Sequence, residues 1–261
     1  MRALSTAATG MLAQQLNVEV ISNNIANMNT TGFKRQRAEF QDLLYQEVVR
    51  SGANSSDQGT VVPSGVQVGT GVKTAGVYRI STQGNLVETG NSLDLAIQGK
   101  GFYRVQLPSG DFAYTRSGSF QVDGTGQLVT AKGYIVEPAI TIPIDATKIS
   151  INRSGEVEVS LDGQVNGQIV GQLDLTTFFN EAGLKAIGDS LLLETAASGP
   201  PTIGIPDTVG VGSIAQGFLE TANVNPVQEI TDLITAQRAY EMNSRVITTA
   251  DEMLQVTTNL R

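Results

Sequence analysis

The sequence predicts an α+β fold in which long N- and C-terminal helices form a coiled-coil-like bundle, with an inserted all-β domain and an extended linker region. Apolar residues recur every seven positions near both ends of the chain, as in helices that pack on other helices. The middle of the chain alternates short β-prone runs with turn dipeptides. We therefore expect a terminal helical domain at 1–32 and 222–261, a linker and loop region at 33–71, and a β-rich outer domain at 72–217.

The N-terminal helix is predicted from an apolar residue at every seventh position, namely Leu4, Met11, Val18 and Ile25. Ala7 and Ile21 lie on the neighbouring line of the same helix. The only charged side chains before Phe33 are Arg2 and Glu19. Because so few charges face water, this helix is poorly suited to stand alone and should pack on other helices.

The stretch SNNIANMNTTGFKR, residues 22–35, predicts the end of that helix. Asn and Thr side chains compete with the backbone for hydrogen bonds, so they favour caps and turns over helix interiors. Glycine adopts a left-handed conformation without steric cost. We expect this helix-stop motif to convert helix into extended chain through Asn23, Asn24, Asn27, Gly32 and Phe33.

The linker region that follows ends in a stretch rich in Gly, Ser and Asn, residues 51–71. Irregular loops of this length are uncommon in compact domains unless they are functional. We expect the stretch either to act in function or to become ordered against a partner.

The central zone predicts β-structure because turn pairs separate its short runs: Ser109-Gly110, Asp123-Gly124, Ser154-Gly155, Asp162-Gly163 and Asn166-Gly167. Within it, GEVEVSL at 155–161 alternates polar and apolar residues, which is typical of a half-buried strand.

The C-terminal helix is predicted to start at Pro226 after Asn225, with Glu229 and Asp232 in its early turns. Two apolar stripes follow at seven-residue spacing. One consists of Leu233, Tyr240, Ile247 and Leu254, and the other of Ala239, Val246, Met253 and Leu260. Two stripes indicate a helix with several helical neighbours, although packing on a globular core would explain one of them. We expect both stripes, and that of the N-terminal helix, to make helix or inter-subunit contacts.

Composition argues against most kinds of chemistry. The net charge of −8 disfavours nucleic acid as a partner, since phosphate binding needs clustered Lys and Arg. The chain has no Cys and no His, which removes thiol chemistry, the usual zinc sites and Ser-His-Asp catalysis. The N-terminus shows neither a cleavable leader nor a membrane span. Glu156 and Glu158 share a strand face without apolar surroundings, and residues 69–74 lack phosphate-loop spacing. We therefore expect no catalytic, cofactor or metal site.

Motifs at the two ends of the chain resemble those of the flagellar rod and hook protein family. The N-terminal motif comprises SNNIAN at 22–27 and TGFK at 31–34; the C-terminal motif comprises NVN at 223–225, VQEI at 227–230, QRAYE at 237–241 and ADEML at 250–254. Residues 92–134 are also similar to the rod-type β domain. Within the family, the chain resembles the basal-body rod members, and those of the distal rod most.

This resemblance implies a structural subunit of the flagellar distal rod, exported unfolded and polymerised into a hollow helical drive shaft that transmits torque to the hook. Its implied partners are further copies of itself, the proximal rod proteins, the hook protein, the peptidoglycan- and outer-membrane-ring bushings, and the export apparatus. It implies no nucleic acid and no membrane insertion. Its implied location is the periplasm-spanning rod of the basal body, reached without a cleaved signal peptide. Residues 54–71 would stiffen the polymer by bridging neighbouring subunits.

Phe40 and Leu44 resemble the F-x-x-x-apolar element that engages the export gate in rod and hook subunits. The alternative is that both side chains pack against the β domain. Three alternatives to the distal-rod function remain open: another axial subunit of the proximal rod or hook, a secreted β-rich binding protein, and a peptidoglycan hydrolase. The hydrolase would need a buried acid or an activated nucleophile, for which the sequence offers no candidate geometry.

Overall fold

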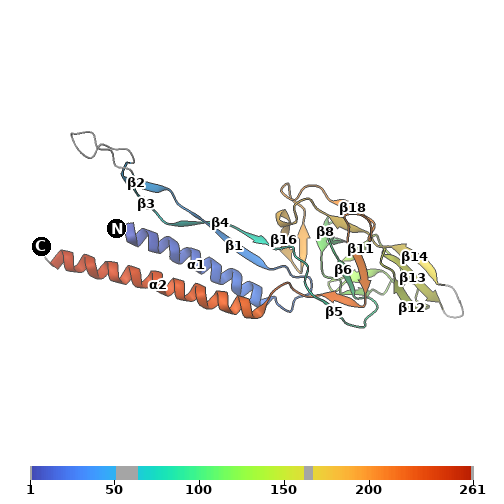
Figure 1. Ribbon diagram of the computed structural model, residues 1–261. Helices are drawn as coiled ribbons and strands as arrows, with labels where there is room; N and C mark the ends of the chain where they lie inside the picture. Colours follow the sequence, from blue (N-terminus) through green and yellow to red (C-terminus); the bar gives the residue numbers. More distant parts are fainter. Residues whose placement is uncertain (1, 51–63, 162–166, 260–261) are drawn as a thin grey trace. The chain divides into compact units, whose positions relative to one another are not determined.

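The computed structural model describes residues 2–50, 64–161 and 167–259, and the chain divides into two compact units. Unit 1 is drawn from Met1–Ile25, Gln36–Tyr78 and Asn225–Arg261, and unit 2 from Ala26–Arg35 and Arg79–Val224. The described part of the chain contains two α-helices, α1 (Arg2–Ala26) and α2 (Pro226–Asn259), and otherwise mainly β-strands (Figure 1). The α+β class predicted from the sequence is therefore correct.

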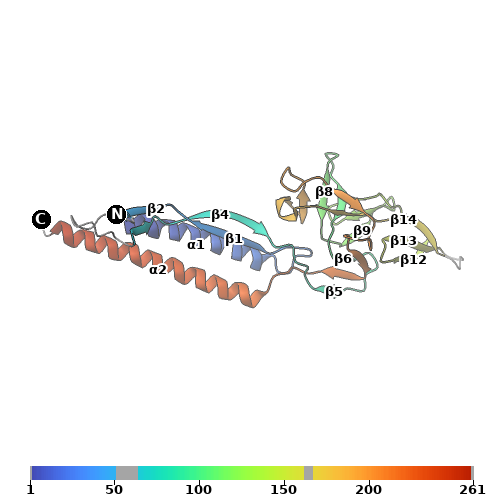
Figure 2. The same cartoon turned by 45° about the horizontal axis from the view of Figure 1, so that its top comes forward.

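Helix α2 begins where the sequence predicts. The side-chain oxygen Oδ1 of Asn225 accepts hydrogen bonds from the backbone N–H groups of Val227 (3.1 Å) and Gln228 (3.4 Å). These groups have no partner inside a helix, so Asn225 is the N-cap and Pro226 takes the first helical position. In both views α2 runs alongside α1 (Figures 1 and 2).

The predicted coiled-coil-like bundle is wrong. Two α-helices within the described ranges make no bundle, and their buried side chains are not those of the predicted stripes. Leu4, Met11, Val18 and Ile25 are half-buried, while Tyr240 and Leu254 are 43% and 42% exposed. The buried positions of α1 and α2 are instead Ala7, Ala13, Val20, Ile21, Asn24, Glu229, Ala236 and Ala250. One helix can cover only one stripe of another, and the stripe with small side chains lets the two helix axes come closest. The predicted stripes of larger side chains are therefore left half-buried or exposed.

Unit 1 also contains two β-ribbons. Strand β1 (Gln36–Asp42) pairs with β4 (Val72–Arg79), and β2 (Tyr45–Val49) pairs antiparallel with β3 (Val66–Gly69). The Oγ1 of Thr9 on α1 accepts a hydrogen bond from the N–H of Val72 (3.3 Å). Gly71 precedes it with a φ of +132°, and a Cβ at this position would collide with Thr9, so only glycine fits here.

Unit 2 is built on a seven-stranded antiparallel sheet in the order β16-β17-β8-β7-β11-β10-β9. In chain order its strands are β7 (Tyr103–Gln106), β8 (Phe112–Thr115), β9 (Phe120–Val122), β10 (Leu128–Thr130), β11 (Ile135–Glu137), β16 (Lys185–Gly188) and β17 (Leu191–Leu193). A three-stranded sheet contains β12 (Ala146–Ile151), β13 (Glu156–Leu161) and β14 (Gln168–Gln172). Three strand pairs complete the unit: β15 (Leu175–Thr177) with β18 (Thr202–Gly204), β19 (Ser213–Gln216) with β6 (Leu95–Gln98), and β20 (Phe218–Glu220) with β5 (Leu86–Glu88). A 3-10 turn, η1, covers Glu181–Gly183.

The core of unit 2 is formed by side chains from these sheets. Tyr103 and Phe120 meet edge to face with ring centroids 5.0 Å apart, and both are buried. The alternation predicted for 155–161 is confirmed, since Val157 and Val159 of β13 are buried. Predicted turns are confirmed at Gly110 and Gly155, which have φ values of +93° and +80° next to hairpins. The pair Asp162-Gly163 and residue Asn166 lie outside the described residues.

Candidate functional site: the terminal helices and the segment after the first helix

The amide of Asn24, in the last turns of α1, is a buried three-way junction within unit 1. Its Nδ2 donates to the carbonyl of Gln36 (2.8 Å), and its Oδ1 accepts from the N–H of the same residue (2.9 Å). Nδ2 also donates to Oε2 of Glu229 on α2 (3.0 Å). Asn24 is 1% exposed and Glu229 is fully buried. Because its side chain pairs with Gln36 as a backbone would, Asn24 ties together α1, the start of β1 and the start of α2.

The other residues of the predicted helix-stop motif lie around the end of α1. Asn23 is exposed on the helix. The carbonyl of Asn27 accepts from the N–H of Thr30 (3.0 Å), which begins the turn, and the N–H of Phe33 donates to the carbonyl of Thr30 (3.3 Å). Gly32 has a φ of +68°, and a Cβ there would lie 2.7 Å from the backbone nitrogen of Ser117. The turn therefore needs glycine at position 32 because its φ is positive and because a Cβ would collide with the backbone of Ser117 in the same unit.

A buried ion cluster holds the segment 26–35 within unit 2. The Glu220 carboxylate accepts from Nζ of Lys34 (2.6 Å), Nε of Arg116 (2.5 Å) and the N–H of Gly84 (2.9 Å). Burial raises the pKa of the Glu220 carboxyl, but the charge of Arg116 and the hydrogen bonds from Lys34 and Arg116 outweigh it, and the pKa lies below its ordinary value. Glu220 therefore stays ionised at neutral pH.

Arg116 also caps three main-chain carbonyls. Its guanidinium donates to the carbonyls of Gly101 (2.6 Å) and Gly99 (2.6 Å) in the β6–β7 turn and to that of Ile97 (3.1 Å) in β6. Sequence reasoning missed this cluster, because Arg116 and Glu220 lie 104 residues apart with no local motif. Phe218 and Glu220 share one face of β20, but this spacing does not say which partner the carboxylate of Glu220 meets.

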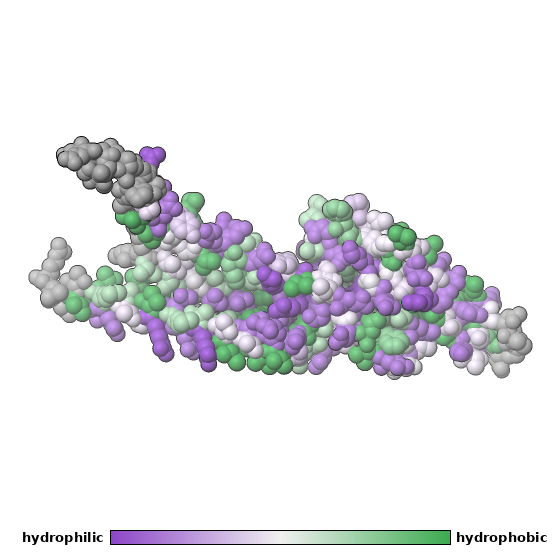
Figure 3. Space-filling model, in the orientation of Figure 1, coloured by the Kyte–Doolittle hydropathy of each residue, from purple (hydrophilic) through white to green (hydrophobic). Residues whose placement is uncertain are grey.

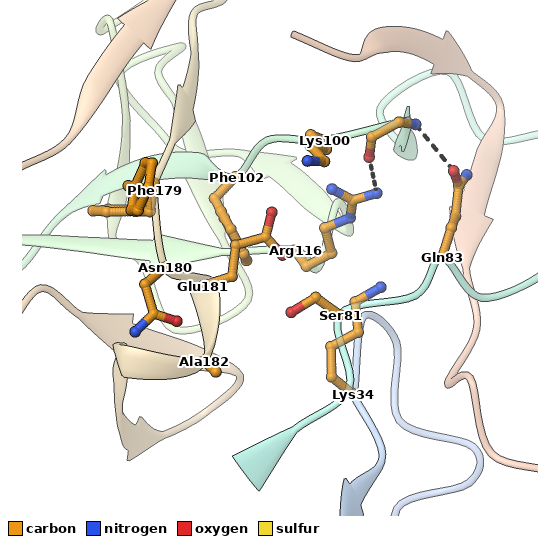
Figure 4. A pocket seen from close by; sticks show the side chains of 12 residues that line it. Lys34, Ser81, Gln83, Lys100, Phe102, Arg116, Phe179, Asn180, Glu181 and Ala182 are labelled. Carbon is orange, nitrogen blue, oxygen red and sulfur yellow. Dashed lines mark hydrogen bonds between the residues drawn. The ribbon is translucent and has the colours of Figure 1, made fainter. Parts of the chain in front are cut away.

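The charged cluster borders a pocket of about 500 Å³ in unit 2. Figure 4 shows Lys34 and Arg116 on one side of it and Phe179 and Asn180 on the other. Lys34 and Arg116 donate to Glu220 and to main-chain carbonyls, so their charges are already compensated. In the ranges that the structure describes, no three His, Cys, Asp or Glu side chains gather closely enough to hold a metal ion.

The weak enzymatic candidates from the sequence do not form a site. Glu156 accepts a hydrogen bond from Asn152 (2.6 Å) across its turn, and Glu158 is exposed on β13. The phosphate-loop-like residues 69–74 join β3 to β4, whereas a phosphate loop precedes a helix.

Large apolar side chains are exposed along α2, as Figure 3 shows in green over this helix. They are Val227, Ile230, Ile234, Tyr240, Met242, Val246, Met253, Leu254 and Val256. Of the other predicted stripe residues, Leu233, Ala239 and Ile247 are half-buried and Leu260 lies outside the described residues. A groove of about 360 Å³ between α1 and α2 is lined by Gln15, Val18, Glu19, Gln237, Tyr240 and Glu241. Neither described helix is long and apolar enough to span a membrane.

The two residues of the predicted export element lie on the ribbon of unit 1. Phe40 is half-buried on β1, and Leu44, between β1 and β2, is 87% exposed.

Three segments of the chain match flagellar protein families. Residues 4–34 match the flagella basal body rod protein family, residues 96–159 the D1 domain of the flagellar hook proteins FlgE/F/G, and residues 215–260 the C-terminal region of the flagellar basal body rod proteins FlgEFG. These segments contain α1 with its stop motif, much of the seven-stranded sheet, and α2.

Curated relatives cover the whole chain. The flagellar basal-body rod protein FlgG of Caulobacter vibrioides is 62% identical over 100% of both chains. FlgG of Borreliella burgdorferi is 48% identical over 100% of this chain and 99% of the relative. The flagellar hook-basal body complex protein FlhP of Bacillus subtilis is more distant, at 30% identity over 100% of both chains.

Proposed function

Because the chain belongs to the FlgG family of flagellar basal-body rod proteins, we propose that it polymerises through its terminal helices into the hollow helical shaft of the rod. The chain is a structural subunit of the distal rod in the flagellar basal body. In our proposal, the polymer transmits torque to the hook and crosses the periplasm.

The observation that carries the assembly proposal is the exposed apolar surface of α2. Val246 and Met253 are 46% and 61% exposed, although each belongs to a stripe at seven-residue spacing. Fully burying one such side chain contributes about 1.5–3 kcal/mol. Several large apolar side chains exposed on one helix are typical of an interaction site, and helices of neighbouring copies have the matching period.

Further partners are proposed from the family. They are the proximal rod proteins, the hook protein, the peptidoglycan- and outer-membrane-ring bushings and the export apparatus. For export, we propose that Phe40 and Leu44 engage the gate, and the exposure of Leu44 leaves it accessible for this contact. The proposed stiffening loop at 54–71 lies mostly outside the described residues, although its end contains β3.

A charge-insertion experiment tests assembly. The variant Val246→Glu with Met253→Glu should fail to polymerise and fail to restore motility in a strain that lacks the rod protein. Its melting temperature should stay unchanged, because these side chains contact water in the single chain. The control, Ser244→Glu with Gln255→Glu, adds the same charge at exposed polar positions of α2 and should assemble. Normal assembly of the first variant, or a lowered melting temperature, would show that the stripe is not an assembly surface.

A further inference from the structure

Two contacts fix the alignment of α1 and α2. The first is the hydrogen bond that Asn24 donates to Glu229 (3.0 Å). The second is the close approach of Gly10 to the side chain of Asn243, where an added Cβ would lie 2.9 Å from Nδ2. The two contacts are separated by fourteen residues in each helix, counted in opposite directions. The helices are therefore antiparallel and keep one register over two heptads, which places Asn17 opposite the buried Ala236.

The line where the helices meet consists of small and polar residues. On α1 it contains Gly10, Asn17 and Asn24, and on α2 Glu229, Ala236 and Asn243. Small residues let the helices approach closely, but they discriminate poorly between registers, because a slip of one heptad again places Gly10 opposite a small residue, Ala236. Packing alone therefore leaves the alignment under-determined.

The buried polar contact removes this ambiguity. A slip of seven residues would bring Asn17 to Glu229 and carry Glu229 away from Asn24. The amide of Asn24 is held in place by both backbone groups of Gln36, so it would keep a buried N–H without its acceptor. An unmade buried hydrogen bond costs more than a made one contributes, and polar residues inside helix pairs specify register in this way.

We propose that Asn24 and Glu229 form a register lock, which selects one antiparallel alignment of α1 and α2. The lock is a property of the single chain. Its consequence for assembly rests on the proposed function: one alignment brings Val18 of α1 and Tyr240 of α2 to the same groove, so that a neighbouring copy meets a single composite surface. A slip would move α2 by about 10 Å along α1 and separate these side chains.

Disulfide trapping in the purified monomer tests the lock, because the chain contains no cysteine. The pair Asn17→Cys with Ala236→Cys reports the observed register. The pair Gly10→Cys with Ala236→Cys reports the register slipped by one heptad. In the otherwise unchanged chain we expect oxidation to cross-link the first pair and not the second.

Replacing Asn24 by Asp keeps the oxygen that accepts from Gln36, removes the N–H groups that donate to Gln36 and Glu229, and places a second carboxylate beside Glu229. We expect the yield of the cross-link that reports the slipped register to rise by ~10-fold or more. The matched control, Asn23→Asp, makes the same change at an exposed neighbouring position and should leave the pattern unchanged. Glu229→Gln keeps an acceptor for Asn24 and should also preserve the observed register.

A further variant, Glu229→Leu, removes the acceptor altogether. The N–H of Asn24 is then unsatisfied in both the observed and the slipped register, so the variant loses stability but no longer prefers one alignment. We therefore expect both cross-links to form while the helical circular dichroism signal is retained. If Glu229→Leu and Asn24→Asp keep only the observed register, or if the unchanged chain forms both cross-links or neither, the lock is refuted. Failure of the unchanged chain to polymerise despite a correct cross-link would refute the assembly function and leave the lock intact.

Discussion

Removing the carboxylate of Glu220 should destabilise unit 2 more than any exposed charge could. In Glu220→Ala, Lys34 and Arg116 lose their common acceptor, and their side chains are only 10% and 7% exposed. The N–H of Gly84 loses its partner as well. Two buried cations would then face each other without compensation.

The magnitude follows from the burial of the cluster. Breaking a buried ion pair by removing one partner costs about 3–5 kcal/mol, because the remaining charge stays desolvated. For a unit of this size, each kcal/mol lowers the melting temperature by about 2–4 °C, so we expect a drop of roughly 6–20 °C. Exposed ion pairs contribute only about 0–1 kcal/mol.

Thermal unfolding of the purified protein, followed by circular dichroism in the β-sheet region, measures this drop. The control is Glu88→Ala, which removes an exposed carboxylate from β5, the strand that pairs with the one carrying Glu220. We expect the control to melt within about 2 °C of the unchanged protein. Equal melting temperatures for Glu220→Ala and the control would refute the reasoning, since the cluster would then contribute no more than a surface charge.

Three further predictions concern single residues. Because the folded-state pKa of Glu220 is lowered, its carboxylate contributes to the free energy of unfolding above the unfolded-state pKa, and this contribution is lost as the pH falls through the folded-state pKa. Glu220→Gln should therefore be less stable than the unchanged protein at pH 7. The difference in stability between the two should shrink below about pH 4. Gly32→Ala should cost more than Gly90→Ala in urea unfolding, because both have positive φ but only Gly32 has the backbone of Ser117 in the way of a Cβ; equal losses would contradict the close contact. Phe40→Ala should reduce secretion into the medium while changing the melting temperature little, and a large loss of stability with normal secretion would instead assign Phe40 to packing.

The sequence predicted those features that depend on local chemistry. Asn225 and Pro226 start α2 because capping and a fixed φ act within one turn, and Val157 and Val159 are buried because a strand alternates its faces. The predicted bundle failed for a physical reason. A seven-residue repeat gives the period of a helix surface, but it does not say which stripe meets the partner, and here Gly10 and Ala236 allow the closest approach.

The buried polar contacts were beyond sequence reasoning. Asn24 was expected to end a helix, but its hydrogen bonds to Gln36 and Glu229 depend on where three separate elements lie. Glu229 was assigned to the favourable charge at a helix start, and its complete burial follows from packing rather than from its position in α2.

The order in which the chain emerges has a consequence for when each unit can form. Unit 1 combines Met1–Ile25, Gln36–Tyr78 and Asn225–Arg261, whereas most of unit 2 is the contiguous stretch Arg79–Val224. Any machine that delivers the chain from its N-terminus releases α2 last. We therefore expect unit 2 to fold early and unit 1 to wait for the end of the chain. The exposed apolar surface that α1 and α2 present together would then form only after α2 has been released.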